Sequence, residues 1–314
     1  MTEISETVET VSVGDTVDKY VRNQPRLIVV PNMGNAGDGL INYSMYSVLR
    51  KRRIPFTVVE AHEISKPDPG ATYLVMANGA LHHAEHPIDR LIYALGRSNA
   101  KMILYSATIQ DREELLKSLP ETAIIIAREP VTYSYAHSVR PDLTVVLSED
   151  ATMSIMDGDA DLPRPGVLLR MEYRLRLFVK TLQLGYPPLF AFFPYAFRNG
   201  KGSHSTFYAL RNDDESVAAD APPKDNVDIS IVCGGKQIER HAEASAASFL
   251  KVIRSKKTIR TDRLHVAIGS CLVKVPCQLS ANSYFKCEAI YKHSLSRRFN
   301  TIEWVNAARK DHQS

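Results

Sequence analysis

Short apolar runs alternate with amphipathic segments through the first half of the chain. Each run has the length and composition of a buried strand, and the segments between them show apolar residues at helical spacing. Continuous apolar strands that alternate with amphipathic helices are typical of a parallel sheet covered by helices. The pattern predicts an α/β domain over residues 26–156. Its strands are expected at residues 26–30, 56–60, 73–76, 101–106, 123–127 and 143–147.

The pattern is interrupted at residues 157–166, where Asp, Gly and Pro gather and predict a linker. A second α/β domain is expected over residues 167–300, so the fold class is α/β with two Rossmann-like domains and a cleft between them. Before the first domain, residues 1–25 read as a flexible leader, and residues 301–314 read as a C-terminal tail helix. The second domain has predicted strands at 167–170, 228–232 and 274–280 and predicted helices at 242–253 and 286–295.

Residues 258–268 are the strongest candidate for chemistry, because a polar turn holding Asp262, Arg263 and His265 precedes a small-residue helix. Arg263 and His265 diverge on a helix but share a face when extended, so a common site requires an extended turn with the helix beginning near His265. Such a turn directs backbone N–H groups at a ligand, and the two side chains add anion binding and a proton donor. The alternative is structural: a buried Arg–Asp pair that caps the helix, with His265 in the core.

Three other positions carry weaker signals. In the first loop, which runs from residue 34 to 39 and includes Asn35, glycines such as Gly37 permit close backbone approach at a helix start. Asp38 could bind a hydroxyl or serve as a base, and it could also be the N-cap of that helix; the two readings are compatible. Arg128 ends a predicted strand, where it either contacts an anion or forms a surface pair with the next residue. Lys286 begins a predicted helix and either reaches the cleft or is solvated.

Composition narrows the class of function. The chain has a formal charge of +4 and a pI near 8.7, which is too weakly basic to predict a nucleic-acid partner. Three histidines at 82, 83 and 86 lack the spacing of a metal site, so no metal and no cofactor are predicted. Four cysteines without a CxxC pair predict reduced thiols in the cytoplasm. No run is long enough to span a bilayer, and the first residues are not a signal peptide.

Two segments in the middle of the chain do not fit the α/β pattern. Residues 186–201 are aromatic and basic. They form either core packing or a surface that contacts the acceptor or a membrane interface. Residues 211–225 are acidic and read as an exposed loop. Membrane contact through 186–201 would place the protein peripherally at the inner face of the plasma membrane.

Five pieces of the chain together resemble the polysaccharide pyruvyl transferase family. They occur in the family's order, and their combination is specific although no single piece is. The pieces are residues 35–41 (Asn-Ala-Gly-Asp-Gly-Leu-Ile), Arg128-Glu129, residues 148–151 (Ser-Glu-Asp-Ala), residues 261–265 (Thr-Asp-Arg-Leu-His) and Lys286. The sequence departs from the family's pattern at Ala77-Asn78-Gly79, where a glycine triplet is expected, and at Glu149-Asp150-Ala151, which lacks the usual Pro. Residues 170–225 match nothing, so the acceptor remains open.

The resemblance implies a fold similar to the glycosyltransferase B (GT-B) type and transfer of pyruvate from phosphoenolpyruvate to a sugar of an exopolysaccharide or cell-wall glycan precursor. It implies Arg263, His265 and Arg128 as catalytic residues at the phosphoenolpyruvate site, with a glycan or lipid-linked oligosaccharide as acceptor. Two alternatives stay open: a GT-B glycosyltransferase that uses a nucleotide sugar, and a non-catalytic glycan-binding relative. The expected substrate-binding residues are Asn35, Gly37, Asp38, Glu149, Asp150 and Lys286.

Overall fold

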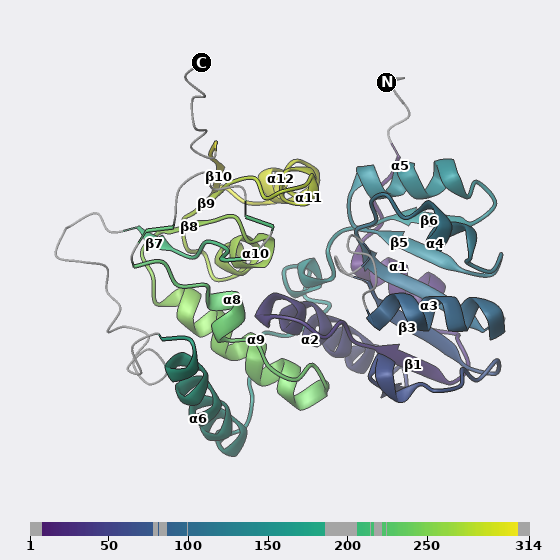
Figure 1. Ribbon diagram of the computed structural model, residues 1–314, viewed down its shortest axis with the longest axis horizontal. Coiled ribbons are helices and arrows are strands. Elements are labelled where there is room, and N and C mark those ends of the chain that lie inside the picture. Colours follow the sequence, from purple (N-terminus) through teal and green to yellow (C-terminus); the bar gives the residue numbers. More distant parts are fainter. Residues whose placement is uncertain are drawn as a thin grey trace. The chain divides into compact units, whose positions relative to one another are not determined.

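A computed structural model of the chain describes residues 8–77, 81, 87–98, 100–185, 206–213, 215–216, 222–223 and 225–306. The chain forms two compact units (Figure 1). Unit 1 consists of residues up to Asn32 together with Met45–Ala160, and unit 2 consists of Met33–Ser44 together with Asp161 onward. The loop and half-helix at residues 33–44 therefore belong to the second unit although they lie early in the sequence.

Unit 1 is built on a six-stranded sheet in the order β2-β1-β3-β4-β5-β6, with every neighbouring pair parallel. Each strand predicted in the first half of the chain is present, which confirms the α/β class. All five residues of β3 are buried, as expected for a strand whose two faces are both covered. The strands are β1 (Leu27–Val30), β2 (Phe56–Val58), β3 (Thr72–Met76), β4 (Lys101–Ala107), β5 (Ile124–Ala127) and β6 (Thr144–Leu147).

The helices that follow these strands pack apolar residues against the sheet. Ile88, Leu91, Ile92 and Leu95 of one helix join the same buried cluster as residues of β3 and β4. These positions recur every three or four residues, which is the spacing of one helix face. The helices are α2 (Ala36–Lys51), α3 (Pro87–Ser98), α4 (Glu113–Lys117) and α5 (Pro130–Val139), with 3₁₀ turns at Ala61–Glu63 and Ala151–Ile155.

The segment predicted to be a flexible leader contains a packed helix, α1 (Val13–Tyr20). Ser12 caps it by accepting a hydrogen bond from the Asp15 N–H at 3.1 Å. Val13 and Val17 are fully buried, because residues four apart share one face of the helix. Residues 11–21 therefore differ from the flexible leader that was predicted over residues 1–25.

Unit 2 contains a second, four-stranded parallel sheet in the order β10-β9-β8-β7. The predicted strand over 274–280 is confirmed as β9, and the predicted helix over 242–253 lies inside α9. The strands are β7 (Phe207–Tyr208), β8 (Ile259–Thr261), β9 (Cys277–Leu279) and β10 (Ile302–Trp304). The helices are α6 (Val167–Gln183), α8 (Ile229–Val232), α9 (Glu239–Arg254), α10 (Leu264–Leu272), α11 (Lys286–Ile290) and α12 (Ser296–Arg298), with a π-helical turn at Tyr291–Leu295.

Three predictions for unit 2 are wrong. Residues 167–170 begin helix α6, and residues 229–232 form α8, whose N-terminus is capped by the Asp228 side chain. The tail predicted as a helix starts with β10, which pairs with β9. Short apolar runs do not distinguish a strand from a buried helical turn, which accounts for the first two errors. Residues 307–314 lie outside the described part of the chain.

Two further sequence predictions concern the arrangement of the domains and the crossing of a membrane. The GT-B-type arrangement of two domains stays a prediction, because each unit is described by itself. In the part of the chain that the structure describes, no helix combines the length and hydropathy needed to traverse a bilayer.

Candidate active site

The turn between β8 and α10 has the extended form that the sequence predicts. β8 ends at Thr261, and α10 begins at Leu264, one residue before His265. Arg263 is the N-cap residue and is extended, with φ −98° and ψ 114°. The hydroxyl of Thr261 accepts a hydrogen bond from the Arg263 N–H at 3.0 Å, which fixes the turn. Arg263 therefore leaves the end of a parallel strand, where ligands of α/β folds bind.

The guanidinium of Arg263 is buried and held by two carboxylates. One of its terminal nitrogens donates to Asp213 at 2.8 Å and also to Asp228. The side chain is only 4% exposed. Its Nε is buried and has no hydrogen-bond partner among the described residues. A buried donor without an acceptor is costly, so this position favours a ligand oxygen.

Arg263 belongs to a larger ionic network in unit 2 that also contains Lys286. Asp213 accepts from Arg211 at 2.7 Å, Arg211 contacts Glu215 at 2.6 Å, and Glu215 contacts Lys286 at 3.3 Å. The structure thus brings together Arg263 and Lys286, two of the predicted site residues, through partners that sequence reasoning missed.

The exposed loop predicted over residues 211–225 is wrong at its start, because Arg211 is 7% exposed and Glu215 is largely covered. The backbone N–H of Arg211 also donates to Asp262 at 2.9 Å, which anchors the segment against the strand-to-helix turn. The signal available in the sequence was Arg211, which lies two residues before the first acidic residue, Asp213. Because Arg211 pairs with Asp213 and Glu215, the charges of this segment are balanced and part of it can be buried.

The network shifts the pKa values of its members in opposite directions. Burial would raise the pKa of Asp213, but the hydrogen bond from Arg211 and the charges of Arg263 and Arg211 lower it to about 2. Burial raises the pKa of Asp262 despite the hydrogen bond from Arg211. Burial opposes the charge on Lys286, yet the nearby Tyr284 and Glu215 raise its pKa. Lys286 therefore keeps its charge, with Glu215 as its acidic neighbour.

His265 lies directly against the first loop of the chain. A Cβ atom placed on Gly37 would be 2.6 Å from the His265 Cβ and 2.7 Å from its Nδ1. Both residues belong to unit 2, so the structure brings together two predicted site segments that are more than two hundred residues apart. Only a glycine at position 37 allows the imidazole to lie this close to the backbone at the start of α2.

The N-cap of α2 is Asn35 and not Asp38. The Asn35 Oδ1 accepts from the Gly37 N–H at 2.8 Å, and Asp38 accepts from the Asn35 N–H at 3.0 Å. This reciprocal arrangement is a variant of the capping box, in which the third helical residue bonds back to the N-cap. The Gln237 side chain donates to the Asn35 carbonyl at 3.3 Å. The loop that packs on His265 is thus held in place through Asn35.

In unit 1, Arg128 occupies the end of β5 and forms a buried ion pair with Asp150 at 2.7 Å. Its Nε donates to the Thr108 hydroxyl at 2.8 Å, and its side chain is 1% exposed. The alternative of a surface pair with Glu129 is wrong, because Glu129 is buried and accepts from the Thr132 N–H at 2.9 Å as the cap of α5. Burial raises the pKa of Glu129.

For the remaining predicted site residues, the structure shows fewer contacts that bear on a function. Glu149 precedes Asp150 and is half-buried, and the roles of both in substrate binding stay predictions. The histidines at 82, 83 and 86 and the aromatic segment 186–201 lie outside the described residues. Within the described ranges, no group of three or more His, Cys, Asp or Glu side chains is arranged to hold a metal ion. All four cysteines are buried and free of disulfides, and burial raises the pKa of the Cys277 thiol to about 12.

Comparison with known proteins identifies a family and a fold. The family model described as polysaccharide pyruvyl transferase matches residues 35–284, which include every predicted site residue except Lys286. No curated protein matches the chain. The crystal structure of a functionally uncharacterized protein from Klebsiella pneumoniae subsp. pneumoniae is similar, with a TM-score of 0.66 and 20% identity. The alignment covers 93% of this chain and 96% of that one, and at this identity the likeness shows the fold alone.

Proposed function

Because the chain belongs to the polysaccharide pyruvyl transferase family, we propose that it moves the pyruvate moiety of phosphoenolpyruvate onto a sugar of an exopolysaccharide or cell-wall glycan precursor. Two hydroxyls of the acceptor become bridged by a pyruvate ketal, and inorganic phosphate is released. The donor and the class of acceptor are the parts of this proposal that go beyond family membership.

One observation in unit 2 carries the proposal. Arg263 and His265 leave the same strand-to-helix turn, and the buried Nε of Arg263 is a donor without an acceptor among the described residues. Phosphoenolpyruvate carries a carboxylate and a phosphate, which are the anions that a guanidinium binds best. An oxygen of either group would satisfy the Nε–H and place the rest of the molecule near His265.

The chemistry requires one proton donor. Attack of the first sugar hydroxyl on C2 breaks the C2–C3 π bond, and C3 takes up a proton to become a methyl group. Attack of the second hydroxyl on C2 closes the ketal, and the C2–oxygen bond to phosphate breaks, so the remaining hydroxyl proton leaves with the phosphate. His265 is the assigned acid and base, because an imidazole gives and retakes protons near neutral pH.

The other residues have supporting parts in this proposal. Asp38 holds the N–H of Asn35, so we assign it to positioning the loop against His265. Lys286 and Arg211 hold the acidic partners of the network in place. Arg128, in unit 1, is proposed as a second contact for the donor, as the sequence predicts.

The test is phosphate release from phosphoenolpyruvate, measured across a panel of glycan acceptors. His265→Ala is expected to lower turnover by about 10²–10⁴-fold, the range for loss of a general acid–base. His62→Ala is the matched control, since His62 is an exposed histidine of unit 1 and should leave turnover unchanged. Full activity of His265→Ala would remove the assignment. Thermal stabilisation by a UDP-sugar, and none by phosphoenolpyruvate, would favour a glycosyltransferase instead.

A further inference from the structure

Helix α6 exposes a continuous apolar stripe along its whole length. The residues of the stripe follow one another at intervals of three or four positions, so they lie on one face of the helix. Their exposed fractions range from 46% to 83%, which is unusual for large apolar side chains that share a face. The stripe consists of Leu168, Met171, Leu175, Val179 and Leu182.

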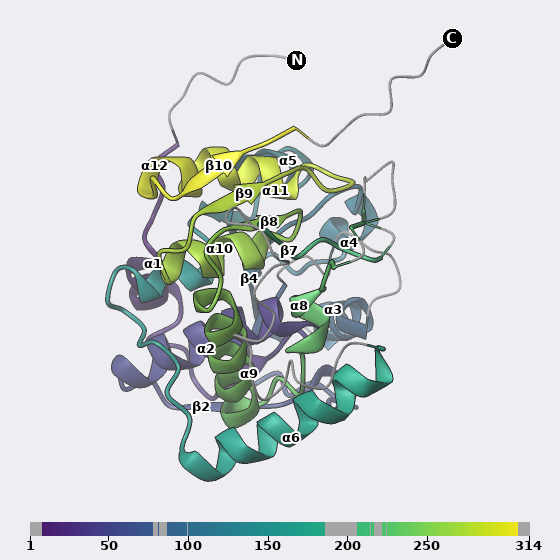
Figure 2. The same cartoon turned by 90° about the vertical axis from the view of Figure 1, so that its left-hand side faces the viewer.

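The opposite face of α6 is the one that packs on unit 2. Tyr173, Leu177 and Thr181 are buried there, and the helix contacts α9 and α8. Figures 1 and 2 both show α6 beside α9 at the edge of the unit. The stripe therefore adds nothing to the core of unit 2, and its apolar surface faces outward.

Positive charge flanks the stripe on both sides. Arg174 and Arg176 are the immediate neighbours of Leu175, so they project about 100° to either side of it. The helix has one acidic residue, Glu172, and its carboxylate pairs with Arg176 at 2.8 Å. Apolar residues on one face and cations on both flanks are the pattern of a helix that lies in the plane of a membrane interface.

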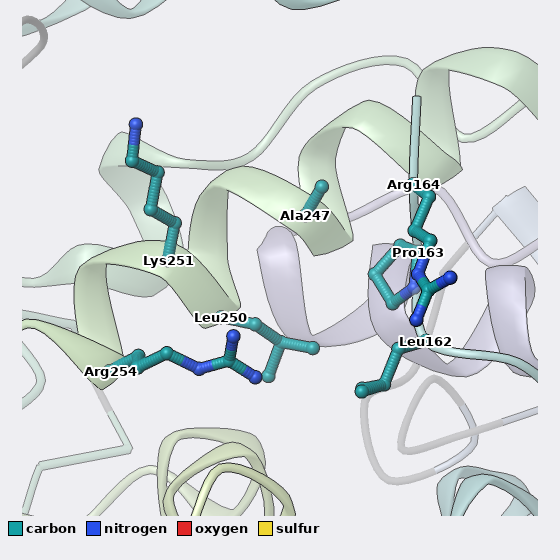
Figure 3. Close-up of a pocket in the computed structure, with 7 residues that line it drawn as sticks. All are labelled: Leu162, Pro163, Arg164, Ala247, Leu250, Lys251 and Arg254. Atoms are coloured by element: carbon teal, nitrogen blue, oxygen red, sulfur yellow. The ribbon is translucent and has the colours of Figure 1, made fainter. Parts of the chain in front are cut away.

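The cationic character extends from α6 onto α9. The pKa of Lys251 is lowered first by burial and then by the positive charges of Arg174 and Arg170. Lys251 also lines a cavity of about 380 Å³, together with Arg164 and Arg254 (Figure 3). Among the described residues that line this cavity, none is acidic. A cluster of cations that repel one another is stabilised by an anionic surface.

We propose that unit 2 docks on an anionic lipid bilayer through α6. The apolar stripe inserts at the boundary between headgroups and acyl chains, and Arg170, Arg174 and Lys251 lie among the anionic headgroups. A second copy of the chain fits this face poorly, because a symmetric contact would bring the same arginines face to face. The inference is independent of the proposed pyruvyl transfer, since docking needs neither donor nor acceptor.

The experiment is co-sedimentation of the full chain with vesicles of phosphatidylcholine alone or mixed with phosphatidylglycerol. The wild type is expected to bind the anionic vesicles and to release at high salt. The triple variant Leu168→Ser, Met171→Ser, Leu175→Ser is expected to bind these vesicles with an affinity that is lower by about tenfold or more. Arg170→Glu with Arg174→Glu should lose the preference for anionic vesicles. Val131→Ser with Met156→Ser, which changes exposed apolar residues of unit 1, is the matched control and should bind as the wild type does.

Three results would overturn the proposal. The first is a wild type that ignores anionic vesicles, and the second is a triple variant that binds them as well as the wild type does. The third is a concentration-dependent dimer, seen by analytical ultracentrifugation without lipid, that the triple variant abolishes. The substituted side chains are exposed, so an unchanged thermal midpoint will show that each variant is folded. Phe192→Ser with Phe193→Ser tests the separate sequence prediction for residues 186–201.

Discussion

Two arginines occupy equivalent places in the two units, and the structure treats them differently. Arg128 follows β5 and precedes α5, while Arg263 follows β8 and precedes α10. Both side chains are almost fully buried. The Nε of Arg128 donates to Thr108, and its Nη1 pairs with the buried Asp150. The Nε of Arg263 has no partner in the described part of the chain, and one of its two carboxylates, Asp213, is 42% exposed.

The difference separates a guanidinium whose Nε–H is matched inside the fold from one whose buried Nε–H is not. A guanidinium whose donors are matched by internal acceptors contributes to the fold, and removing it leaves a buried charge behind. A guanidinium with an unmatched buried donor beside a water-accessible carboxylate is prepared for a further acceptor. Position at the end of a parallel strand, which is what the sequence shows, does not distinguish the two cases.

Arg128→Ala is expected to have the largest effect on stability. It removes the partner of Asp150 and should lower the free energy of unfolding by about 3–5 kcal/mol, the range for breaking a buried ion pair. Urea denaturation followed by circular dichroism measures the change. Lys117→Ala, which breaks an exposed pair on α4, should leave the midpoint nearly unchanged. A small effect of Arg128→Ala would contradict its role as an anchor, and lost turnover in the folded variant would support its predicted contact with the donor.

Arg263→Lys should change activity more than stability. Lysine keeps the positive charge between Asp213 and Asp228 but lacks the Nε–H and the planar fork. Phosphate release from phosphoenolpyruvate is expected to fall by about 10²-fold, similar to the loss of one preorganised donor. Arg260→Lys on the same strand is the control and should leave release unchanged. Equal activity in the two variants would mean that the Nε–H of Arg263 takes no part in binding the donor.

Gly37→Ala tests whether the position of His265 matters. The added Cβ would come within 3.0 Å of three His265 atoms, so the imidazole must move. A displacement of the catalytic group by a fraction of an ångström is expected to lower turnover by about tenfold. Gly166→Ala is the matched control, because its added Cβ meets no atom within 4 Å. Unchanged turnover in Gly37→Ala would show that His265 does not need its present position.

Unit 1 could be predicted from the sequence almost strand by strand, and unit 2 only in part. The strands of unit 1 are continuous apolar runs at regular spacing, a signal that depends on local sequence alone. In unit 2, residues 167–170 have the composition of a strand but begin α6, because burial of Tyr173 and Leu177 selects the helical period. The run at 228–232 is too short to specify either structure. Tertiary packing decides such segments.

The candidate site shows the same limit. The sequence placed Arg263 and His265 on one extended turn and suggested that Gly37 allows close approach, and the structure has both features. It did not reveal Asp213, which holds Arg263, or Arg211, which pairs with Asp213. Residues 211–216 have the composition of a solvated loop. Composition alone does not predict which of several charged side chains is buried. Only the three-dimensional neighbours of Arg211 settle that question.

Asp213→Asn is expected to have the smallest effect, and it depends on pH. The pKa of Asp213 is lowered to about 2, whereas an unfolded aspartate titrates near pH 3.9. The charged carboxylate therefore contributes stability that is fully present above about pH 4 and is lost as the pH falls toward 2. Asparagine keeps an acceptor for Arg211 but has no charge. Thermal unfolding should show the wild type slightly more stable than the variant at pH 6, with the difference vanishing near pH 2; a constant difference would contradict the ionic role.

Asp262→Asn gives an internal control of opposite sign. Burial raises the pKa of Asp262, so its protonated form is favoured in the folded state and its ionisation costs stability. Relative to this variant, the wild type should lose stability as the pH rises past about 4, where the unfolded aspartate ionises. Opposite trends for two aspartates within one network would show that Asp213 is held as an anion by Arg263 and Arg211. If the two variants followed the same trend, the charge of Arg263 would not stabilise the Asp213 carboxylate. The contrast with the buried Arg128–Asp150 pair would then be wrong.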